Sequence, residues 1–351
     1  MDYLPLGNTG LYVSRLCFGA MTFAEPEQKH MAWLGNEGQE SADQMIGTAL
    51  EAGINFFDTA NIYANGASEQ MLGKALAKKR DDVIIATKLY HPSGADANSM
   101  GTSRVAIMRE VEGSLERLGT DRIDLYQVHS WDTTTPIEET LRALDDCVRQ
   151  GKVRYIGLSN FAAWQIAHAD GVARLHGTER FCSVQAYYSL VGRELEREIL
   201  PATKHLGLGT MIFSPLAAGF LSGKYTDTED TGDTVGRRSR FSFPPVDPAA
   251  GDEVVRVLRE IGDAHGVSPS QVAICWLLHQ DGVTTVIVGA RKHDQLVDNL
   301  SAIDLELSDD ELNRLNEVSQ QRPEYPQWMP SLERAGDPAA AIKHSAKVAI
   351  S

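Results

Sequence analysis

The chain has 351 residues, of which 42% are hydrophobic and 23% charged, and its formal net charge is −15. This composition is ordinary for a globular protein, and the negative charge argues against binding to nucleic acid or acidic membranes. The apolar runs are too short for a membrane span, and the N-terminus lacks a basic start and a long apolar core. We therefore expect a cytoplasmic protein without a secretory signal. Four widely spaced cysteines predict reduced, buried thiols rather than a disulfide frame or a metal site.

The first elements in the chain are predicted to form a β-hairpin over residues 3–14, because short alternating runs flank Asn and Gly. Apolar runs then alternate with helical patterns, which is typical of successive βα units. Eight runs are predicted to be buried strands: 16–20, 54–58, 83–88, 123–129, 153–158, 181–185, 210–214 and 284–288. Eight units in one chain favour a closed (β/α)₈ TIM barrel over an open doubly wound sheet. We expect one α/β domain with the hairpin and two extra helices, a core over residues 6–319 and an irregular tail over 320–351.

Helix boundaries are also marked in the sequence. The third predicted helix has one apolar stripe, made of Ile107, Val111, Leu115 and Leu118. Gly119 follows it as a stop signal. Two late helices are predicted to open with capping boxes, Ser268 to Gln271 and Ser308 to Glu311. In contrast, residues 216–252 have no helical or strand period, which predicts a long irregular loop such as a lid or a binding loop.

Reactive side chains follow several predicted strands at the point where each strand ends. Asp58 ends the second strand, Tyr63 lies in the loop after it, and Lys88 and His129 end the next two. The carboxyl ends of barrel strands converge on one face, so these groups are expected to meet there. A Lys ammonium beside a Tyr lowers the pKa of the phenol from about 10 towards neutrality, where it acts as a general acid. Taken singly, each group also has an ordinary structural explanation as an ion pair or a packing residue.

Together, these motifs resemble those of an aldo-keto reductase, from about Leu6 to about Ser319. They are Asp58-Thr59-Ala60-x-x-Tyr63 with Gly66 and Glu69, Thr87-Lys88, Gln127-Val128-His129, Gly157-x-Ser159-Asn160 and Phe213-Ser214-Pro215-Leu216. The resemblance is to bacterial-type NADP-dependent enzymes related to the potassium-channel β-subunit branch. It implies reduction of an aldehyde or ketone to an alcohol by a reduced nicotinamide. Tyr63 would donate the proton, Lys88 and Asp58 would tune it, and His129 would position the carbonyl.

The resemblance also implies a cofactor site. Ser159, Asn160 and Gln185 would bind the nicotinamide amide, and Phe213 would stack on its ring. The segment from Leu216 to Lys224 would strap the pyrophosphate, with Gly219, Leu221 and Gly223 in it. Ser214 and Pro215, just before it, would also contact the cofactor. The 2′-phosphate would lie at Arg291, adenosine contacts would come from Gln295 and Asn299, and Gly289 would also contact the cofactor. A basic pair at a helix start suits the 2′-phosphate, so we expect NADPH rather than NADH.

Substrate contacts are expected from four aromatic residues near the barrel mouth, Trp33, Tyr90, Trp131 and Trp328, each of which is also a plausible packing residue. The substrate is then a small carbonyl compound or alcohol. An alternative is a nucleotide-binding regulatory or interaction subunit with little turnover, and an oligomer is compatible with either function. A third hypothesis is an aldolase that forms a Schiff base at Lys88. The sequence has no Gly-x-Gly-x-x-Gly, and residues 219–225 lack the spacing of a phosphate loop.

Overall fold

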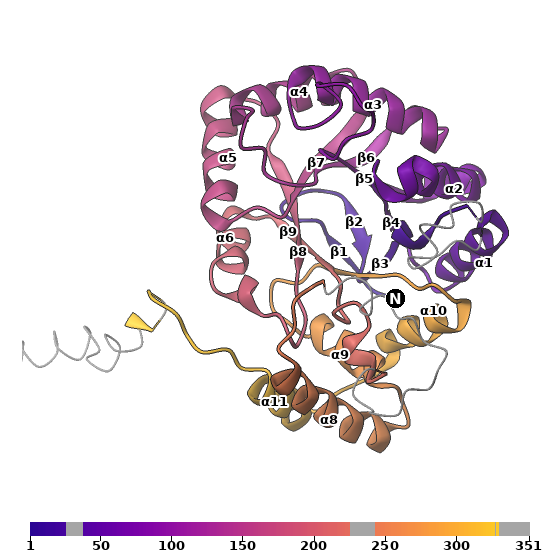
Figure 1. Cartoon of the computed structure of the whole chain (residues 1–351), viewed down its shortest axis with the longest axis vertical. Helices are drawn as coiled ribbons and strands as arrows, with labels where there is room; N and C mark the ends of the chain where they lie inside the picture. The colour runs from indigo at the N-terminus through magenta and orange to yellow at the C-terminus, as the bar shows by residue number, and fades with distance from the viewer. Residues whose placement is uncertain (26–37, 225–242, 327, 330–351) are drawn as a thin grey trace, which may run out of the picture. The chain divides into compact units, whose positions relative to one another are not determined.

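Eight parallel strands close into a barrel in the computed structural model of the chain (Figure 1). Their order around the barrel is β10, β3, β4, β5, β6, β7, β8 and β9, and β10 also pairs with β9 to complete the ring. The strands are β3 (Leu16–Gly19), β4 (Phe56–Asp58), β5 (Ile84–Leu89), β6 (Ile123–Val128), β7 (Val153–Ser159), β8 (Phe181–Tyr187), β9 (Gly209–Phe213) and β10 (Thr285–Val288). The predicted (β/α)₈ barrel is therefore confirmed.

The structure describes residues 1–25, 38–224, 243–326 and 328–329. It divides into two units, Met1–Ser319 and Gln320–Ser351, and the barrel lies in the first. The predicted N-terminal hairpin is also confirmed, since β1 (Tyr3–Pro5) pairs antiparallel with β2 (Tyr12–Ser14).

Helices surround the strands in Figure 1. Eight of them connect successive barrel strands or follow the last one: α1 (Gly38–Glu51), α2 (Ala67–Leu76), α3 (Arg104–Leu118), α4 (Ile137–Arg149), α5 (Ala163–His176), α6 (Ile199–Leu206), α9 (Pro269–Leu278) and α10 (His293–Leu300). Two more, α8 (Pro248–His265) and α11 (Asp309–Val318), pack against each other and correspond to the extra helices expected. Within the described ranges, no helix is long and apolar enough to span a membrane.

Short 3₁₀ turns connect several of these elements. They are η1 (Ala20–Thr22), η3 (Tyr63–Gly66), η4 (Ala77–Asp82), η5 (Glu194–Glu196), η6 (Phe220–Ser222) and η7 (Ser301–Asp304). Two of them follow barrel strands. The turn η1 begins at the residue after β3, and η3 begins five residues after β4 ends. These turns therefore help to form the carboxyl end of the barrel.

The helix caps agree with the sequence in part. Gly119 ends α3 in the left-handed conformation, and the capping box of α11 at Ser308 is complete. At α9, Ser268 caps the helix as predicted, but the Gln271 side chain donates to Asp298 at 2.7 Å instead of returning to the cap. That predicted capping box is therefore only half formed, because a tertiary acceptor lies within reach of the amide.

The stretch over residues 216–252, predicted to be irregular throughout, contains regular structure at both ends. The turn η6 lies near its start, and α8 begins at Pro248, capped by the side chain of Asp247. An Asp followed by Pro is a helix-start signal, but it has no hydrophobic periodicity, so a prediction based on periodicity does not include it. Residues 225–242 lie outside the described part of the chain.

Two apolar clusters stabilise the barrel, one between strands and helices and one inside. The inner cluster includes Phe56, Leu125 and Met211, together with Leu6 and Val13 of the hairpin region. Since Asn8 donates to the carbonyl of Gly207, just before β9, the hairpin region covers the amino end of the barrel. All four cysteines are buried and free, as expected. The carboxyl end of the barrel is left to carry the polar residues.

Candidate active site

A buried ion pair lies where β4 ends. Asp58 is the last residue of β4, and Lys88 lies on the neighbouring β5 with no exposed surface. The Lys88 Nζ is 2.5 Å from Asp58 Oδ2 and also donates to the carbonyl of Thr59 at 2.8 Å. Two buried opposite charges with this geometry compensate each other's loss of hydration. The pairing predicted from the two strand ends is therefore present.

The other carboxylate oxygen of Asp58 accepts two amide hydrogen bonds. Gln127 Nε2 donates to Oδ1 at 3.0 Å, and Gln185 Nε2 donates to the same atom at 2.8 Å. Gln185 Nε2 also lies 3.4 Å from Gln127 Oε1. Three donated bonds, one from each of Lys88, Gln127 and Gln185, hold Asp58 in place. The sequence indicates Gln127 only as part of a motif, because the direction of its side chain depends on barrel closure.

Tyr63 begins η3, and its hydroxyl lies 3.4 Å from Lys88 Nζ. The loop that carries it is fixed to the neighbouring strand, because the Asn61 amide donates to the carbonyl of Lys88 at 3.1 Å. The Asn61 side chain also donates to the buried carboxylate of Glu110 on α3 at 2.9 Å. These bonds hold the phenol close to the ammonium.

The Lys88 ammonium remains charged. Burial alone would lower its pKa, but the carboxylate of Asp58 and the hydroxyl of Tyr63 outweigh burial and raise the pKa above its ordinary value. The positive charge of Lys88 stabilises the phenolate form of Tyr63, so the phenol gives up its proton more readily than it would without this neighbour.

His129 follows β6 directly, one residue beyond the observed strand end. Its ring stands edge-on to that of Tyr63, with centroids 5.9 Å apart. Burial, aided by Lys88 and His91, lowers the pKa of His129 well below its ordinary value, so the ring is neutral. Its Nδ1 is enclosed and finds no hydrogen-bond partner among the described residues. A neutral imidazole beside the phenol can orient a carbonyl oxygen without adding charge.

His91 is a second imidazole that we did not identify from the sequence. The backbone turns at Tyr90, where φ is 135°, and the His91 ring then lies edge-on to His129 with centroids 4.8 Å apart. Burial lowers the pKa of His91 as well. The available signal was its position three residues after Lys88, just beyond a strand end.

A cavity of about 810 Å³ opens over these groups. It is within the usual size range of small-molecule sites. The predicted residues that line it are Asp58, Tyr63, His129, Ser159, Asn160, Gln185, Phe213, Ser214, Pro215, Leu216, Gly219, Lys224, Gly289, Arg291, Gln295 and Asn299. The barrel therefore brings most of the predicted catalytic and cofactor residues to one surface.

Several predicted residues lie elsewhere. Leu221 is buried in the core, and Gly223 accepts from Arg259 at 3.0 Å behind the strap. Tyr90 and Trp131 are absent from the cavity lining, and the Trp131 ring packs against Phe161. Of the remaining aromatic residues, Trp33 lies outside the described residues and Trp328 belongs to the second unit.

The amides at the centre of the cavity have fixed polarity. Asn160, in the left-handed conformation with φ 58°, donates through Nδ2 to the carbonyl of His129 at 3.0 Å and to Ser159 Oγ at 3.1 Å. Because a carbonyl only accepts, Nδ2 must be the nitrogen, and Oδ1 remains as an acceptor. By the same reasoning, Gln185 keeps Oε1 as an acceptor, since its nitrogen donates to Asp58. The Ser159 hydroxyl, which accepts from Asn160, retains its hydrogen to donate.

The strap after β9 has an unusual backbone. Three residues other than glycine adopt left-handed conformations, Ser214, Ala217 and Ala218, with φ of 54°, 47° and 55°. Such conformations cost free energy and tend to occur at functional sites. The Ser214 hydroxyl accepts from the Ala218 amide at 3.2 Å, which holds the turn closed. Phe213, at the start of this strap, packs against the Tyr187 ring with centroids 6.0 Å apart.

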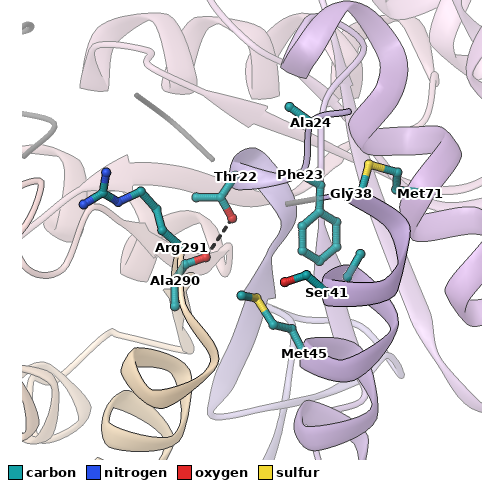
Figure 2. Close-up of a pocket in the computed structure, with 10 residues that line it drawn as sticks. Thr22, Phe23, Ala24, Gly38, Ser41, Met45, Met71, Ala290 and Arg291 are labelled. Carbon is teal, nitrogen blue, oxygen red and sulfur yellow. Dashed lines mark hydrogen bonds between the residues drawn. The ribbon is translucent and has the colours of Figure 1, made fainter. Parts of the chain in front are cut away.

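The far end of the cavity contains the start of α10. Arg291, Gln295 and Asn299 line it, whereas the neighbouring Lys292 is absent from the lining. The Thr22 hydroxyl donates to the carbonyl of Ala290 at 2.9 Å and fixes the turn before α10 (Figure 2). Arg291 also lines the small pocket around Phe23, and in the same view its guanidinium extends away from the Phe23 ring. One basic side chain of the predicted pair therefore lines the cavity.

The cavity also has lining residues that we did not predict. They include Gly19, Met21, Thr22, Ile62, His91, Ala218, Ser222, Phe243, Ser270, Ile287, Val288, Ala290 and Asp298. Met21 and Thr22 follow β3, so the rule that strand ends carry the site would have identified them. Phe243 lies in a stretch without any sequence period, which left no signal to find it.

Comparison with known proteins identifies the family. The aldo/keto reductase family model matches residues 15–320. An uncharacterized oxidoreductase of Bacillus subtilis, YrpG, is 37% identical over 330 residues, covering 91% of this chain and 96% of the relative. Versiconal hemiacetal acetate reductase of Aspergillus parasiticus is 36% identical, covering 90% of this chain and 96% of its own. A probable voltage-gated potassium channel subunit beta of Oryza sativa is 36% identical, with 92% and 98% covered. The chain belongs to the aldo/keto reductase family.

Proposed function

We propose that the protein reduces an aldehyde or ketone to an alcohol with NADPH, and that Tyr63 donates the proton. The observation that supports this most strongly is the arrangement of Asp58, Lys88 and Tyr63. Lys88 Nζ lies 2.5 Å from the carboxylate and 3.4 Å from the phenol, and both of these partners line a large cavity. The Asp58 partnership also argues against a Schiff base at Lys88, because a Schiff base needs a neutral amine.

The polar groups at the centre of the cavity match a primary carboxamide. Such a group has one carbonyl acceptor and two N–H donors. Ser159 offers one hydroxyl donor, and Asn160 Oδ1 and Gln185 Oε1 offer two acceptors. The nicotinamide ring that carries this carboxamide supplies, in its reduced form, a hydride to the carbonyl carbon. Phe213 provides an aromatic surface beside the same groups.

Proton transfer then falls to the chain's own side chains. Tyr63 Oη gives its proton to the substrate oxygen as that oxygen gains negative charge, and Lys88 stabilises the phenolate that remains. Asp58 holds Lys88 in position and balances its buried charge. His129, neutral at physiological pH, directs the carbonyl oxygen towards the phenol. A correctly placed general acid contributes about 10²- to 10⁴-fold in rate.

Two cationic side chains in the lining support NADPH rather than NADH. Arg291 and Lys224 line the cavity of a protein with a net charge of −15, so a polyanionic ligand must bind to local positive charge. Arg291 lies at the start of α10, where the helix dipole adds to its attraction for a phosphate.

The first experiment measures NADPH consumption with a reactive aromatic aldehyde and NADPH binding, for wild type and for Tyr63→Phe. We expect the variant to bind NADPH normally and to lose at least about 10²-fold in rate. Equal rates for the two proteins would contradict the role of Tyr63. Tyr126→Phe is a suitable control, because this buried tyrosine lies on β6 but does not line the cavity.

A second candidate function is a regulatory or assembly subunit that retains the nucleotide. The relatives of rice and Arabidopsis thaliana named as probable potassium channel β subunits, 36% and 34% identical, favour it. In that case wild type and Tyr63→Phe would both bind NADPH, and neither would turn over a broad panel of carbonyl compounds.

A further inference from the structure

Gln127 is a buried residue without a role in the proposed reaction. It has no exposed surface and is absent from the cavity lining. On β6 it is the register partner of Lys88 on one side and of Gly157 on the other. A Cβ at Gly157 would lie 3.2 Å from Gln127 Cγ and 2.7 Å from Ser183 Oγ, so the glycine leaves room for this amide. Its side chain therefore lies in one layer of the barrel interior with the ion pair.

Both polar atoms of the Gln127 side chain are committed. Nε2 donates to Asp58 Oδ1 at 3.0 Å, and Oε1 accepts from Gln185 Nε2 at 3.4 Å. The second hydrogen of Gln185 Nε2 is used by Asp58 at 2.8 Å. Gln185 cannot turn its amide over without placing its oxygen against both a carboxylate oxygen and the oxygen of Gln127.

We propose that Gln127 is a positioning residue that fixes the Gln185 amide with its oxygen towards the cavity, and so makes the site selective for a ligand with a primary carboxamide. The inference rests on the proposed function, because the ligand that carries the carboxamide is NADPH. Gln127 acts through Gln185 without touching the ligand. Through Asp58, the same amide also connects carboxamide recognition to the Asp58–Lys88 pair.

A cofactor analogue in which an acetyl group replaces the carboxamide tests this directly. The acetyl group keeps the carbonyl acceptor but has no N–H, so Asn160 Oδ1 and Gln185 Oε1 would lose their donors. Binding of NADPH and of reduced 3-acetylpyridine adenine dinucleotide phosphate is measured by titration without substrate. We expect wild type to bind the analogue at least about tenfold more weakly, because Gln185 is buried and an unpaired buried acceptor is costly.

The Gln127→Met variant removes both bonds of the amide at nearly constant volume. With its second acceptor gone, the Gln185 amide is held only by its bond to Asp58 and is less firmly oriented, so the preference for NADPH over the analogue should fall to about threefold or less. Ser183→Ala is the matched control, since Ser183 Oγ is buried beside Gly157 and finds no partner among the described residues. It should keep the wild-type preference.

The Gln127→Glu variant distinguishes loss of the Gln185 amide orientation from general damage to this layer of the barrel interior. A protonated Glu donates to Asp58 and accepts from Gln185 as Gln does, and a carboxyl beside a carboxylate holds its proton to higher pH. Lys88 is the cation that faces this pair, with Tyr63 and Cys17 nearby. The preference should therefore be near wild type at low pH and fall as pH rises, whereas in Gln127→Met it should be low throughout.

The outcomes are distinguishable from those of the proposed function. If wild type does not bind NADPH, the proposed function fails and this inference with it. If wild type binds NADPH but does not discriminate against the analogue, or if a folded Gln127→Met keeps the full preference, the orientation by Gln127 is wrong. Loss of the preference in Ser183→Ala would likewise overturn it, since any change in the layer would then have the same effect.

Discussion

Asp58 and Lys88 are buried charges, and each one is tolerated because of the other. Lys88→Met leaves the carboxylate without its cation, and Asp58→Asn leaves the cation without its carboxylate. We expect each change to lower the free energy of unfolding by about 3–5 kcal/mol. The double variant should lose clearly less than the sum, because neither charge is then left unpaired. Urea denaturation of the four proteins measures this, and additive losses would contradict a mutual dependence.

The raised pKa of Lys88 determines the pH range over which the Asp58–Lys88 pair stabilises the fold. Since the pKa is higher in the folded than in the unfolded chain, the stabilisation is complete below about pH 10.5, the ordinary value. It is lost only as pH rises through the folded value. The ion pair therefore stays intact over the physiological range.

His129 should make stability depend on pH in the opposite direction. Burial lowers its pKa well below the ordinary 6.5, so below that pH the unfolded chain takes up a proton that the folded chain does not. Relative to His129→Gln, wild type should lose up to about 1.4 kcal/mol of unfolding free energy per pH unit below 6.5. Urea denaturation at pH 7.5, 6.5 and 5.5 checks it. A constant difference between the two proteins would mean that His129 titrates normally.

At the scale of elements, the contact of α2 with α3 depends on a glycine. A Cβ at Gly73 would lie 2.1 Å from the carbonyl oxygen of Leu118 at the end of α3. Gly73→Ala should therefore destabilise the protein by about 1–3 kcal/mol, although alanine favours the helix itself. Gly47→Ala in α1 is the control, because a Cβ there meets nothing within 4 Å, and it should stabilise by about 0.5–1 kcal/mol. Thermal denaturation that gives both changes the same sign would contradict this account.

The elements themselves were largely predictable from the sequence. Strands buried on both faces are continuously apolar, so all eight were found, and only their ends shifted. β6 ends at Val128, leaving His129 just outside, and β8 continues two residues beyond Gln185. The start of α8 was missed because an Asp-Pro cap has no periodicity, and Gln271 was misjudged because its partner Asp298 is distant in sequence.

The candidate site was predictable where it depends on strand ends and not where it depends on loops. Asp58 and Lys88 occupy strand positions that any barrel brings together, whereas Tyr63 lies in a loop and was found through its motif spacing from Asp58. The contact of His91 with His129, by contrast, depends on a turn with positive φ at Tyr90, a residue type that rarely adopts it. Gln127 lies within an apolar run, and its inward direction follows only once the barrel is closed.

At the scale of the whole molecule, a net charge of −15 makes binding of a polyanion depend on a few local cations. NADPH at 100 times its dissociation constant should stabilise the fold by about 2.7 kcal/mol, and NADH at the same concentration by less. Arg291→Gln should remove most of this difference. Lys292→Gln should preserve it, because Lys292 does not line the cavity. Melting temperatures with each nucleotide measure this, and equal effects of the two substitutions would refute a specific role for Arg291.

The hydrogen bonds of Asp58 also have a consequence for how the barrel assembles. Its partners come from β5, β6 and β8, and the last of them, Gln185, is 127 residues away in sequence. As the chain leaves the ribosome, the first strands can meet before Gln185 has been synthesised, with the carboxylate only partly satisfied. A half-barrel that ends before β8 therefore has an incomplete polar centre, which penalises premature compaction. Residues that serve the proposed chemistry would thus also favour completion of the ring over a stable fragment.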